Sequence, residues 1–135
     1  MKKSSFQMIG KPQVTNIRFC INKEYLFSGE IPVEINSHIH ISKNSDEQKR
    51  EAIVTLSIEI FTEEDDSNIP FKLVMENQGC FVWDEELSKD SVQLETMLKQ
   101  NAPAVLYSYL RPIISLITIE ANMPPLVLPL MNFVE

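Results

Sequence analysis

Residues 53–61, Ile-Val-Thr-Leu-Ser-Ile-Glu-Ile-Phe, carry the clearest secondary-structure signal in this chain of 135 residues. Large apolar side chains alternate here with smaller or polar ones. The apolar positions are Val54, Leu56, Ile58 and Ile60, and the positions between them are Thr55, Ser57 and Glu59. Because successive side chains of a strand point to opposite faces, this pattern predicts a β-strand with one buried face.

Three further segments alternate in the same way on either side of residues 53–61. They are residues 14–21, 33–42 and 71–77. Polar stretches separate the segments, among them the acidic run Glu63–Asp66, which we expect to be a solvated turn. Gly79 is expected to introduce a bulge or bend before an extended run continues through residues 80–83. The first two-thirds of the chain is therefore predicted to form strands.

The last third of the chain changes to a helical period. Residues 92–100 predict a short helix, and Asn101 is a candidate N-cap for a second helix that runs to about residue 119. Pro112 lies inside that second helix and is expected to kink it. From Met123 onward the chain is apolar but rich in proline, which argues against a central strand. Strands followed by helices predict one α+β domain over residues 1–135.

Composition and charge exclude several classes of partner. The chain carries 12 basic and 19 acidic side chains and has a net charge of −7, which disfavours nucleic acid and anionic membrane surfaces. The longest apolar runs, residues 112–119 and 123–131, reach only about half a membrane span, and the N-terminus has no signal-peptide pattern. We therefore expect a cytoplasmic protein in which Cys20 and Cys80 are reduced.

Residues that could support catalysis or bind a metal are sparse. The three glycines are too few and too scattered for a dinucleotide-binding or phosphate-binding loop. His38 and His40 share one face of a predicted strand, but no third ligand follows at a suitable spacing for zinc. The acidic run Glu63–Asp66 lacks the spacing of a calcium loop. We predict no enzymatic activity, no metal and no cofactor.

Apolar surface is present in excess of what a thin sheet needs. Phe61, Phe71, Phe81 and Trp83 gather near one predicted sheet corner, and residues 123–133 add many large apolar side chains without periodicity. Two interpretations are open. The helices and the tail cover this surface within one chain, or part of it is a self-association face or a groove for apolar segments of another chain.

Two C-terminal segments resemble a known family. Residues 101–111, Asn-Ala-Pro-Ala-Val-Leu-Tyr-Ser-Tyr-Leu-Arg, and residues 123–133, Met-Pro-Pro-Leu-Val-Leu-Pro-Leu-Met-Asn-Phe, are similar in sequence and spacing to the bacterial export chaperone SecB. The strand that ends at Gly79-Cys80-Phe81 and the opening pair Phe6-Gln7 also resemble that family. The resemblance covers most of the chain in the right order.

The resemblance implies a fold, an activity and an assembly. It implies a four-stranded antiparallel sheet with C-terminal helices packed on one face, in a homotetramer built as a dimer of dimers. It also implies that non-native polypeptides are held in apolar grooves without ATP. The groove positions of the family match Ile39, Ile41 and Phe71 here, and the positions of its dimer–dimer contact match Leu73, Met75 and Asn77.

One surface departs from the family pattern. SecB proteins present acidic residues at positions that match Asn16, Cys20 and Val74, and an apolar residue at the position of Lys72, where the translocase ATPase SecA docks. Because all four differ here, a charge-complementary contact with SecA is in doubt. The alternative is a dedicated interaction protein, such as an antitoxin-associated SecB-like chaperone that does not dock on SecA.

Overall fold

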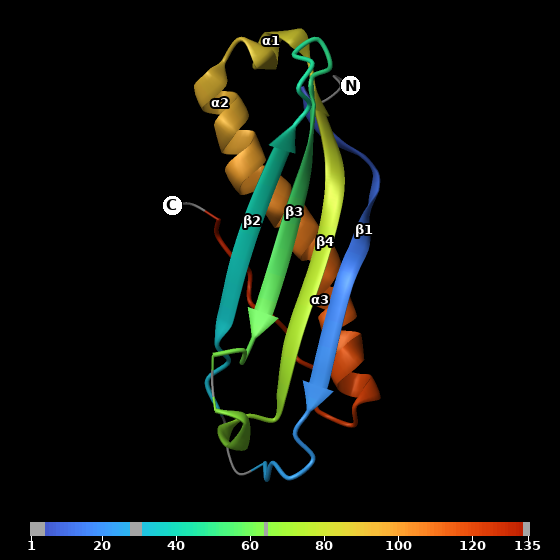
Figure 1. Ribbon diagram of the computed structural model, residues 1–135, viewed down its shortest axis with the longest axis vertical. Coiled ribbons are helices and arrows are strands. Elements are labelled where there is room, and N and C mark those ends of the chain that lie inside the picture. Colours follow the sequence, from blue (N-terminus) through green and yellow to red (C-terminus); the bar gives the residue numbers. More distant parts are fainter. Residues whose placement is uncertain (1–4, 28–30, 64, 134–135) are drawn as a thin grey trace.

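Four strands form one antiparallel sheet in this computed structural model, which describes residues 5–27, 31–63 and 65–133. The strands are β1 (Phe6–Ile21), β2 (Ile35–Lys43), β3 (Glu51–Ile60) and β4 (Phe71–Trp83). Their order across the sheet is β1-β4-β3-β2, so that β1 and β2 are the two edge strands (Figure 1). All three neighbouring pairs are antiparallel.

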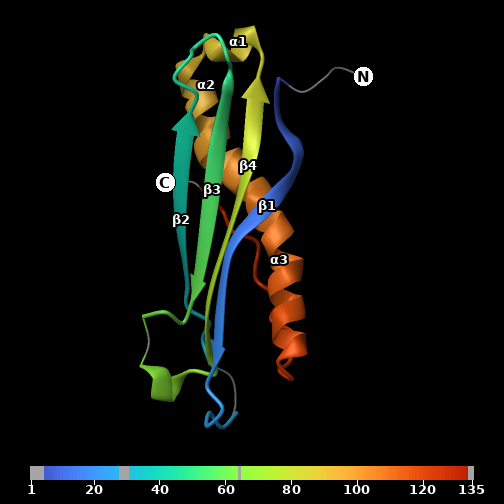
Figure 2. The same cartoon turned by 45° about the vertical axis from the view of Figure 1, so that its right-hand side comes forward.

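The helices follow β4 and cover one face of the sheet. They are α1 (Glu85–Ser88), α2 (Ser91–Thr96), the π-helical turn η2 (Met97–Asn101) and α3 (Ala102–Glu120), while a short 3-10 turn, η1 (Asp66–Asn68), precedes β4. Figure 2 shows α3 crossing behind the strands on a single side. The predicted fold, a four-stranded antiparallel sheet with C-terminal helices on one face, is therefore confirmed.

Aspartate side chains begin the first two of these helices. The Asp84 carboxylate accepts a hydrogen bond from the Leu87 N–H at 2.8 Å, and the Asp90 carboxylate accepts one from the Gln93 N–H at 3.0 Å. Each bond satisfies a backbone donor that has no partner within its own helix. The cap-forming residues between 84 and 91 thus act as their types predict.

The predicted N-cap at Asn101 is wrong. Asn101 has helical backbone angles, φ −74° and ψ −44°, and makes no side-chain cap. The chain passes from α2 through η2 into α3 without leaving the helical region, because the apolar side chains of both helices pack on the sheet. Pro112 lies inside α3 and does not end it.

Because α2, η2 and α3 are continuous, they form a longer apolar segment than residues 112–119, the apolar run identified there from the sequence. Residues Ser91–Glu120 form 30 residues of continuous helix, and a window of 18 residues within it has a mean hydropathy of 1.4, which is sufficient by length and composition to cross a membrane. The same segment is packed on the sheet, with 39% of that window buried. Core helices of globular proteins also meet this test, so packing is enough to account for its apolarity.

The core lies between the sheet and α3. Alternate residues of β3 and β4 face the helix, and the β3 side chains Val54, Leu56 and Ile58 are fully buried. The three residues expected at a dimer–dimer contact are buried too: Leu73 and Met75 are 0% exposed and Asn77 is 1% exposed. Because these side chains already pack under α3 within one protomer, they are not available to a second chain in this structure.

Gly79 allows close packing and does not form the predicted bulge. β4 continues through it from Phe71 to Trp83, and the register shifts of this sheet lie in β1, between Ile9 and Gln13 and between Val14 and Asn16. A Cβ atom on Gly79 would lie 2.9 Å from the Met8 Sδ and 3.3 Å from a Leu106 methyl group. Glycine is therefore needed where α3 and β1 approach β4.

We expect Gly79→Ala to destabilise the fold by about 1–3 kcal/mol, because the added methyl group overpacks this contact. Chemical denaturation would measure the free energy of unfolding. Gly10→Ala is a useful contrast, since Gly10 faces open space but has φ +67°, and its replacement is costly through backbone strain alone. A Gly79→Ala protein as stable as the wild type would show that the contact has room to relax.

The segment after α3 is extended and is fastened to the helix, in agreement with the prediction that it forms no central strand. Polar side chains along one side of α3 form hydrogen bonds with the backbone of this extended segment. Tyr107 Oη, Arg111 Nη2 and Ser115 Oγ donate to the carbonyl oxygens of Pro129, Leu128 and Leu126 at 2.5, 2.7 and 2.6 Å, and Thr118 Oγ1 accepts from the Leu126 N–H at 2.9 Å. Burial raises the pKa of Tyr107, which keeps its hydroxyl protonated as a donor.

Candidate functional site

An apolar pocket of about 200 Å³ lies where the segment between β1 and β2 meets the turn after α3. Side chains from four separate parts of the chain line it. They are Phe27, Ile31, Val33, Phe61, Pro70, Phe71, Thr118, Met123, Pro124, Pro125 and Leu126. Since no lining residue is ionisable, the pocket suits an apolar side chain better than a charged or strongly polar group.

An aromatic cluster forms the floor of the pocket. The ring of Phe71 lies 5.3 Å from the ring of Phe61 in an edge-to-face arrangement and 5.4 Å from the ring of Phe19. Phe61 follows β3 with φ 61°, and its N–H donates to the Glu34 carbonyl at 3.2 Å. This left-handed conformation is uncommon for a bulky residue, and here it turns the chain out of β3 beside the pocket.

The rim of the pocket is exposed. Phe27 is 61% exposed and stacks edge-on against Tyr25 with ring centroids 5.0 Å apart. Burying a large apolar side chain contributes about 1.5–3 kcal/mol. A ligand side chain that enters between Phe27 and the floor would therefore gain contact without any rearrangement of the core.

The predicted groove residues are only partly brought together. Phe71 lines the pocket, but Ile39 and Ile41 do not. They lie on β2, on the sheet face that carries α3, where Ile41 packs against the core and Ile39 is exposed. The residues that the sequence analysis missed include Phe27, Ile31 and Val33, which lie in a segment with no clear periodicity.

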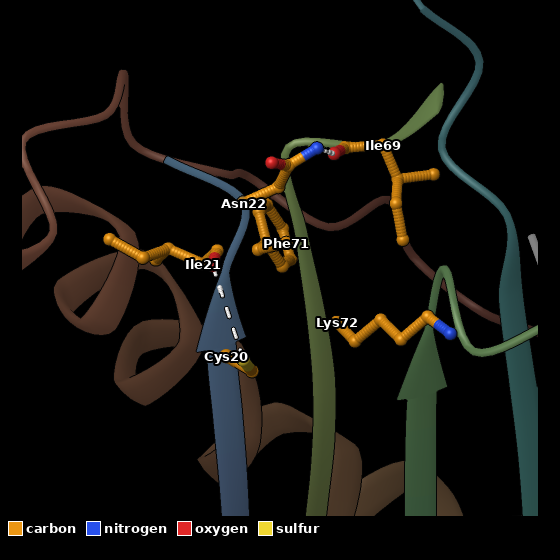
Figure 3. Close-up of a pocket in the computed structure, with 6 residues that line it drawn as sticks. All are labelled: Cys20, Ile21, Asn22, Ile69, Phe71 and Lys72. Atoms are coloured by element: carbon orange, nitrogen blue, oxygen red, sulfur yellow. Dashed lines mark hydrogen bonds between the residues drawn. The ribbon is translucent and has the colours of Figure 1, made fainter. Parts of the chain in front are cut away.

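A second cavity of about 200 Å³ adjoins the pocket behind Phe71, at the end of β1 (Figure 3). Its lining residues are Cys20, Ile21, Asn22, Ile69, Phe71 and Lys72. Asn22 ties the end of β1 to the start of β4, since its Nδ2 donates to the Ile69 carbonyl at 3.1 Å and its N–H donates to the Pro70 carbonyl at 2.8 Å. These two bonds fix the end of β1 against the residues that lead into β4 at Phe71.

The four positions that depart from the SecB docking pattern all lie on the opposite face of the sheet from α3. The β1–β4 register pairs Asn16 with Glu76 and Cys20 with Lys72, and Val74 lies next along the same face. Cys20, Lys72 and Val74 line a shallow hollow together with Arg18, Glu59 and Thr62. On this face, which we call the outer face, the three positions that are acidic in the family are uncharged, and Lys72 adds a positive charge beside Arg18.

The two histidines also lie on the outer face. His38 Nε2 is 3.6 Å from a carboxylate oxygen of Glu59. Across residues 5–27, 31–63 and 65–133, no group of three or more His, Cys, Asp or Glu side chains is arranged to hold a metal ion.

A further apolar surface lies on α3, on the side that faces away from the sheet. Val105, Tyr109, Leu116 and Ile119 are exposed, and at about 100° per residue they fall within a sector of about 80° on the helix. Ile17 and Ile21 of β1 are also exposed and project from the sheet face that carries α3. A helix that is apolar on two opposite sides is usually buried on both.

Comparisons of sequence identify relatives of this chain. The family model for the preprotein translocase subunit SecB matches residues 5–135. The protein-export protein SecB of Anaplasma phagocytophilum is 28% identical over 122 residues, which are 82% of this chain and 75% of that protein. An uncharacterized protein of Methanocaldococcus jannaschii is 30% identical over 120 residues, which are 88% of this chain and 74% of that protein.

A comparison of structures also finds a SecB-like protein. The SecB-like chaperone of Mycobacterium tuberculosis, solved in complex with a ChAD peptide from the HigA1 antitoxin, superposes with a TM-score of 0.70. It is 13% identical in sequence, and the match covers 94% of this chain and 88% of that one. At this identity the likeness establishes the shared fold.

Proposed function

This chain belongs to the SecB family, and from that premise we propose that it is an ATP-independent chaperone that holds non-native polypeptides. The observation that carries this proposal is the open apolar pocket with the exposed Phe27 at its rim. Unfolded chains differ from folded ones chiefly in exposing large apolar side chains. A pocket without ionisable groups recognises those side chains by size and apolarity, independently of sequence.

The charge of the chain fits a holding function. A surface with apolar binding sites is itself prone to aggregate, and a net charge of −7 counteracts this by repulsion between copies. The same charge keeps a complex with an unfolded client dispersed. Binding and release then need no catalytic group, which is consistent with a non-enzymatic protein of the cytoplasm.

We propose that the protein assembles as a homotetramer, a dimer of dimers, through the exposed side of α3 and the adjacent β1. We define this assembly surface by Ile17, Tyr109 and Leu116, which are exposed and apolar. It replaces the contact expected at Leu73, Met75 and Asn77, whose side chains lie inside the protomer. Apolar patches of this kind usually mark self-association in a charged protein.

A dedicated partner is the second candidate function, and the outer face favours it. Arg18 and Lys72 flank the hollow where the family presents acidic residues to SecA. A chaperone that does not dock on SecA would serve another pathway, for example by stabilising one labile partner such as an antitoxin. The client pocket would be the same in both cases, while the range of clients would differ.

Suppression of aggregation separates the two candidates. We expect the protein to slow the aggregation of several unrelated chemically unfolded proteins, as followed by light scattering. Phe27→Ser should weaken this suppression and leave the free energy of unfolding nearly unchanged, because the exposed Phe27 ring contributes little to the core. Suppression of one particular partner alone would favour the dedicated function.

A further inference from the structure

One wall of the apolar pocket comes from the turn that follows α3. Met123 lies in this turn, lines the pocket and is only partly buried. Its thioether packs like the aliphatic and aromatic side chains around it. Among the described residues that line the pocket, Met123 is also the one whose side chain hydrogen peroxide readily converts into a polar group. The polarity of the pocket therefore depends on the oxidation state of one sulfur atom.

The backbone of the turn holds Met123 in place. Asn122 has the left-handed angle φ 61°, its N–H donates to the Ile119 carbonyl at 3.0 Å, and the Met123 N–H donates to the Thr118 carbonyl at 3.0 Å. These two bonds form the Schellman pattern, which closes a helix at a left-handed residue. Two prolines follow directly and restrict the backbone of Met123 and of the positions after it. We therefore expect Met123 to stay at the pocket whether its sulfur is oxidised or not.

The side chains of the pocket offer an oxidised methionine no hydrogen-bond donor. Among the described lining residues, Thr118 has the one polar side chain, and its hydroxyl is already engaged. Thr118 Oγ1 donates to the Ser115 carbonyl at 2.8 Å and accepts from the Leu126 N–H at 2.9 Å. Because a hydroxyl has a single hydrogen to donate, a sulfoxide oxygen in this pocket depends on water for its hydrogen bonds.

The other described methionines lie away from the pocket. Met75 is fully buried under α3. Three more are partly buried against the core and do not line the pocket, namely Met8, Met97 and Met131. Oxidation of these side chains acts on the packing of the core, whereas oxidation of Met123 changes the surface that a client side chain contacts.

We propose that Met123 is a site of reversible oxidation by hydrogen peroxide and that its sulfoxide weakens client binding at the apolar pocket. The proposal rests on the proposed chaperone function and adds a means of regulating it. Met123 is accessible because it is only partly buried. Hydrogen peroxide is small and uncharged, so it can enter a pocket that admits a whole side chain.

The oxidation needs no reactant besides the peroxide. A lone pair of the Met123 sulfur attacks one peroxide oxygen, and an S–O bond forms as the O–O bond breaks. The departing hydroxide takes the proton of the transferred OH group and leaves as water. The sulfur loses two electrons and the peroxide gains them. The reverse step needs a thiol reductant: two thiols become a disulfide and the sulfoxide oxygen leaves as water, a reaction that methionine sulfoxide reductases catalyse.

The sulfoxide is expected to act on binding more than on the fold. While the pocket is empty, water reaches the oxygen because Met123 is partly exposed. A client side chain that enters displaces this water and leaves the oxygen without a donor, which is the costly case for a polar group. We expect client affinity to fall about tenfold, which corresponds to about 1.4 kcal/mol.

Peptide binding before and after oxidation tests the proposal. The probe is a fluorescein-labelled peptide of about twelve residues, rich in leucine and valine and free of methionine and cysteine, and fluorescence anisotropy gives its affinity. The protein is treated with hydrogen peroxide, separated from it and incubated with dithiothreitol, which reverses disulfide formation at Cys20 and Cys80 but not methionine oxidation. We expect mass spectrometry to find Met123 oxidised, with affinity about tenfold lower, and methionine sulfoxide reductases to restore binding.

Three variants separate Met123 from the other methionines. Met123→Leu cannot be oxidised at this position, so its affinity after peroxide should equal its own affinity before treatment. Met131→Leu is the matched control, because Met131 lies on the same segment outside the pocket, and it should lose affinity as the wild type does. Met123→Gln places a polar amide in the pocket and should bind about tenfold more weakly than the wild type without any peroxide. If Met123→Leu does not fold, Met123→Gln and Met131→Gln make the same comparison.

Each outcome decides between the proposals. An untreated wild-type protein that does not bind the peptide overturns the chaperone proposal and the switch with it. If the untreated protein binds, and complete oxidation of Met123 leaves its affinity within about twofold, the switch is overturned and the chaperone proposal stands. The same holds if Met123→Leu loses as much affinity as the wild type, if peroxide leaves Met123 unoxidised, or if the free energy of unfolding falls in step with affinity.

Discussion

A peptide from the basic, zinc-binding C-terminal tail of SecA is expected to bind this protein weakly or not at all. The outer face presents Asn16, Cys20, Lys72 and Val74 at the positions where SecB proteins dock that tail. The register of β1 and β4 places these residues on one surface, with Arg18 beside them. A basic ligand therefore loses three negative partners and meets one added positive side chain, Lys72.

The expected loss of affinity is large. Each missing interfacial charge pair costs on the order of 1 kcal/mol or more, so three lost pairs and one added repulsion correspond to about a thousandfold in affinity at about 1.4 kcal/mol per decade. The acidic run Glu63–Asp66, beside this face, can replace only part of the missing negative charge. Its Asp65 carboxylate already accepts hydrogen bonds from the Ser67 N–H and Oγ, which lower the pKa of Asp65.

Titration calorimetry at low salt measures this contact. The matched variant restores the family pattern with Asn16→Asp, Cys20→Glu, Val74→Glu and Lys72→Leu, and it should gain affinity for the peptide. Submicromolar binding by the wild-type protein would mean that SecA docks on a different surface from the outer face.

The second large effect concerns assembly. We expect Ile17→Asp combined with Leu116→Asp to reduce the proposed tetramer to smaller species, because both residues belong to the proposed assembly surface and are 49% and 55% exposed in the protomer. An unpaired charge in an apolar interface costs several kcal/mol. Static light scattering at micromolar concentration gives the mass, with Leu130→Asp as the control for an exposed apolar residue elsewhere.

Met75→Arg should behave differently from these variants. The contrast tests whether Met75 belongs to the core of the protomer and not to the contact between protomers. Met75 is fully buried under α3, so a charge there destabilises the protomer itself, by roughly 4 kcal/mol or more. We expect unfolding or aggregation rather than a folded monomer. A folded, lower-order Met75→Arg protein, or a wild-type protein that is already monomeric, would contradict the proposed assembly surface.

The alternation of apolar and polar residues made many of the strands predictable from the sequence. Residues 53–61 predicted β3 nearly to its ends, and residues 71–77 predicted the first part of β4, which continues to Trp83 without the bend expected at Gly79. The first half of β1 was missed, because Gly10 and Pro12 interrupt the alternation where the strand is irregular. Asn101 was misread as a cap because local preference does not show that α2, η2 and α3 share one packed face.

The site was less predictable than the fold, for a physical reason. Its pocket combines Phe27, Phe61, Phe71 and residues 123–126, which are far apart in the chain. Only the fold brings them together, and the segment that holds Phe27 has no period. The alternation at Leu73, Met75 and Asn77 correctly indicated an apolar face, but it could not distinguish burial under α3 from burial against a second chain.

Site-specific photo-crosslinking to an unfolded client tests the central claim, that non-native chains bind at the apolar pocket, most directly. A benzophenone side chain is placed at Phe27, on the rim, or at Ile9, which is exposed on the outer face. The account predicts strong crosslinks to several unrelated unfolded proteins from position 27 and few from position 9. Equal crosslinking at both positions, or crosslinking from position 9 alone, would contradict it.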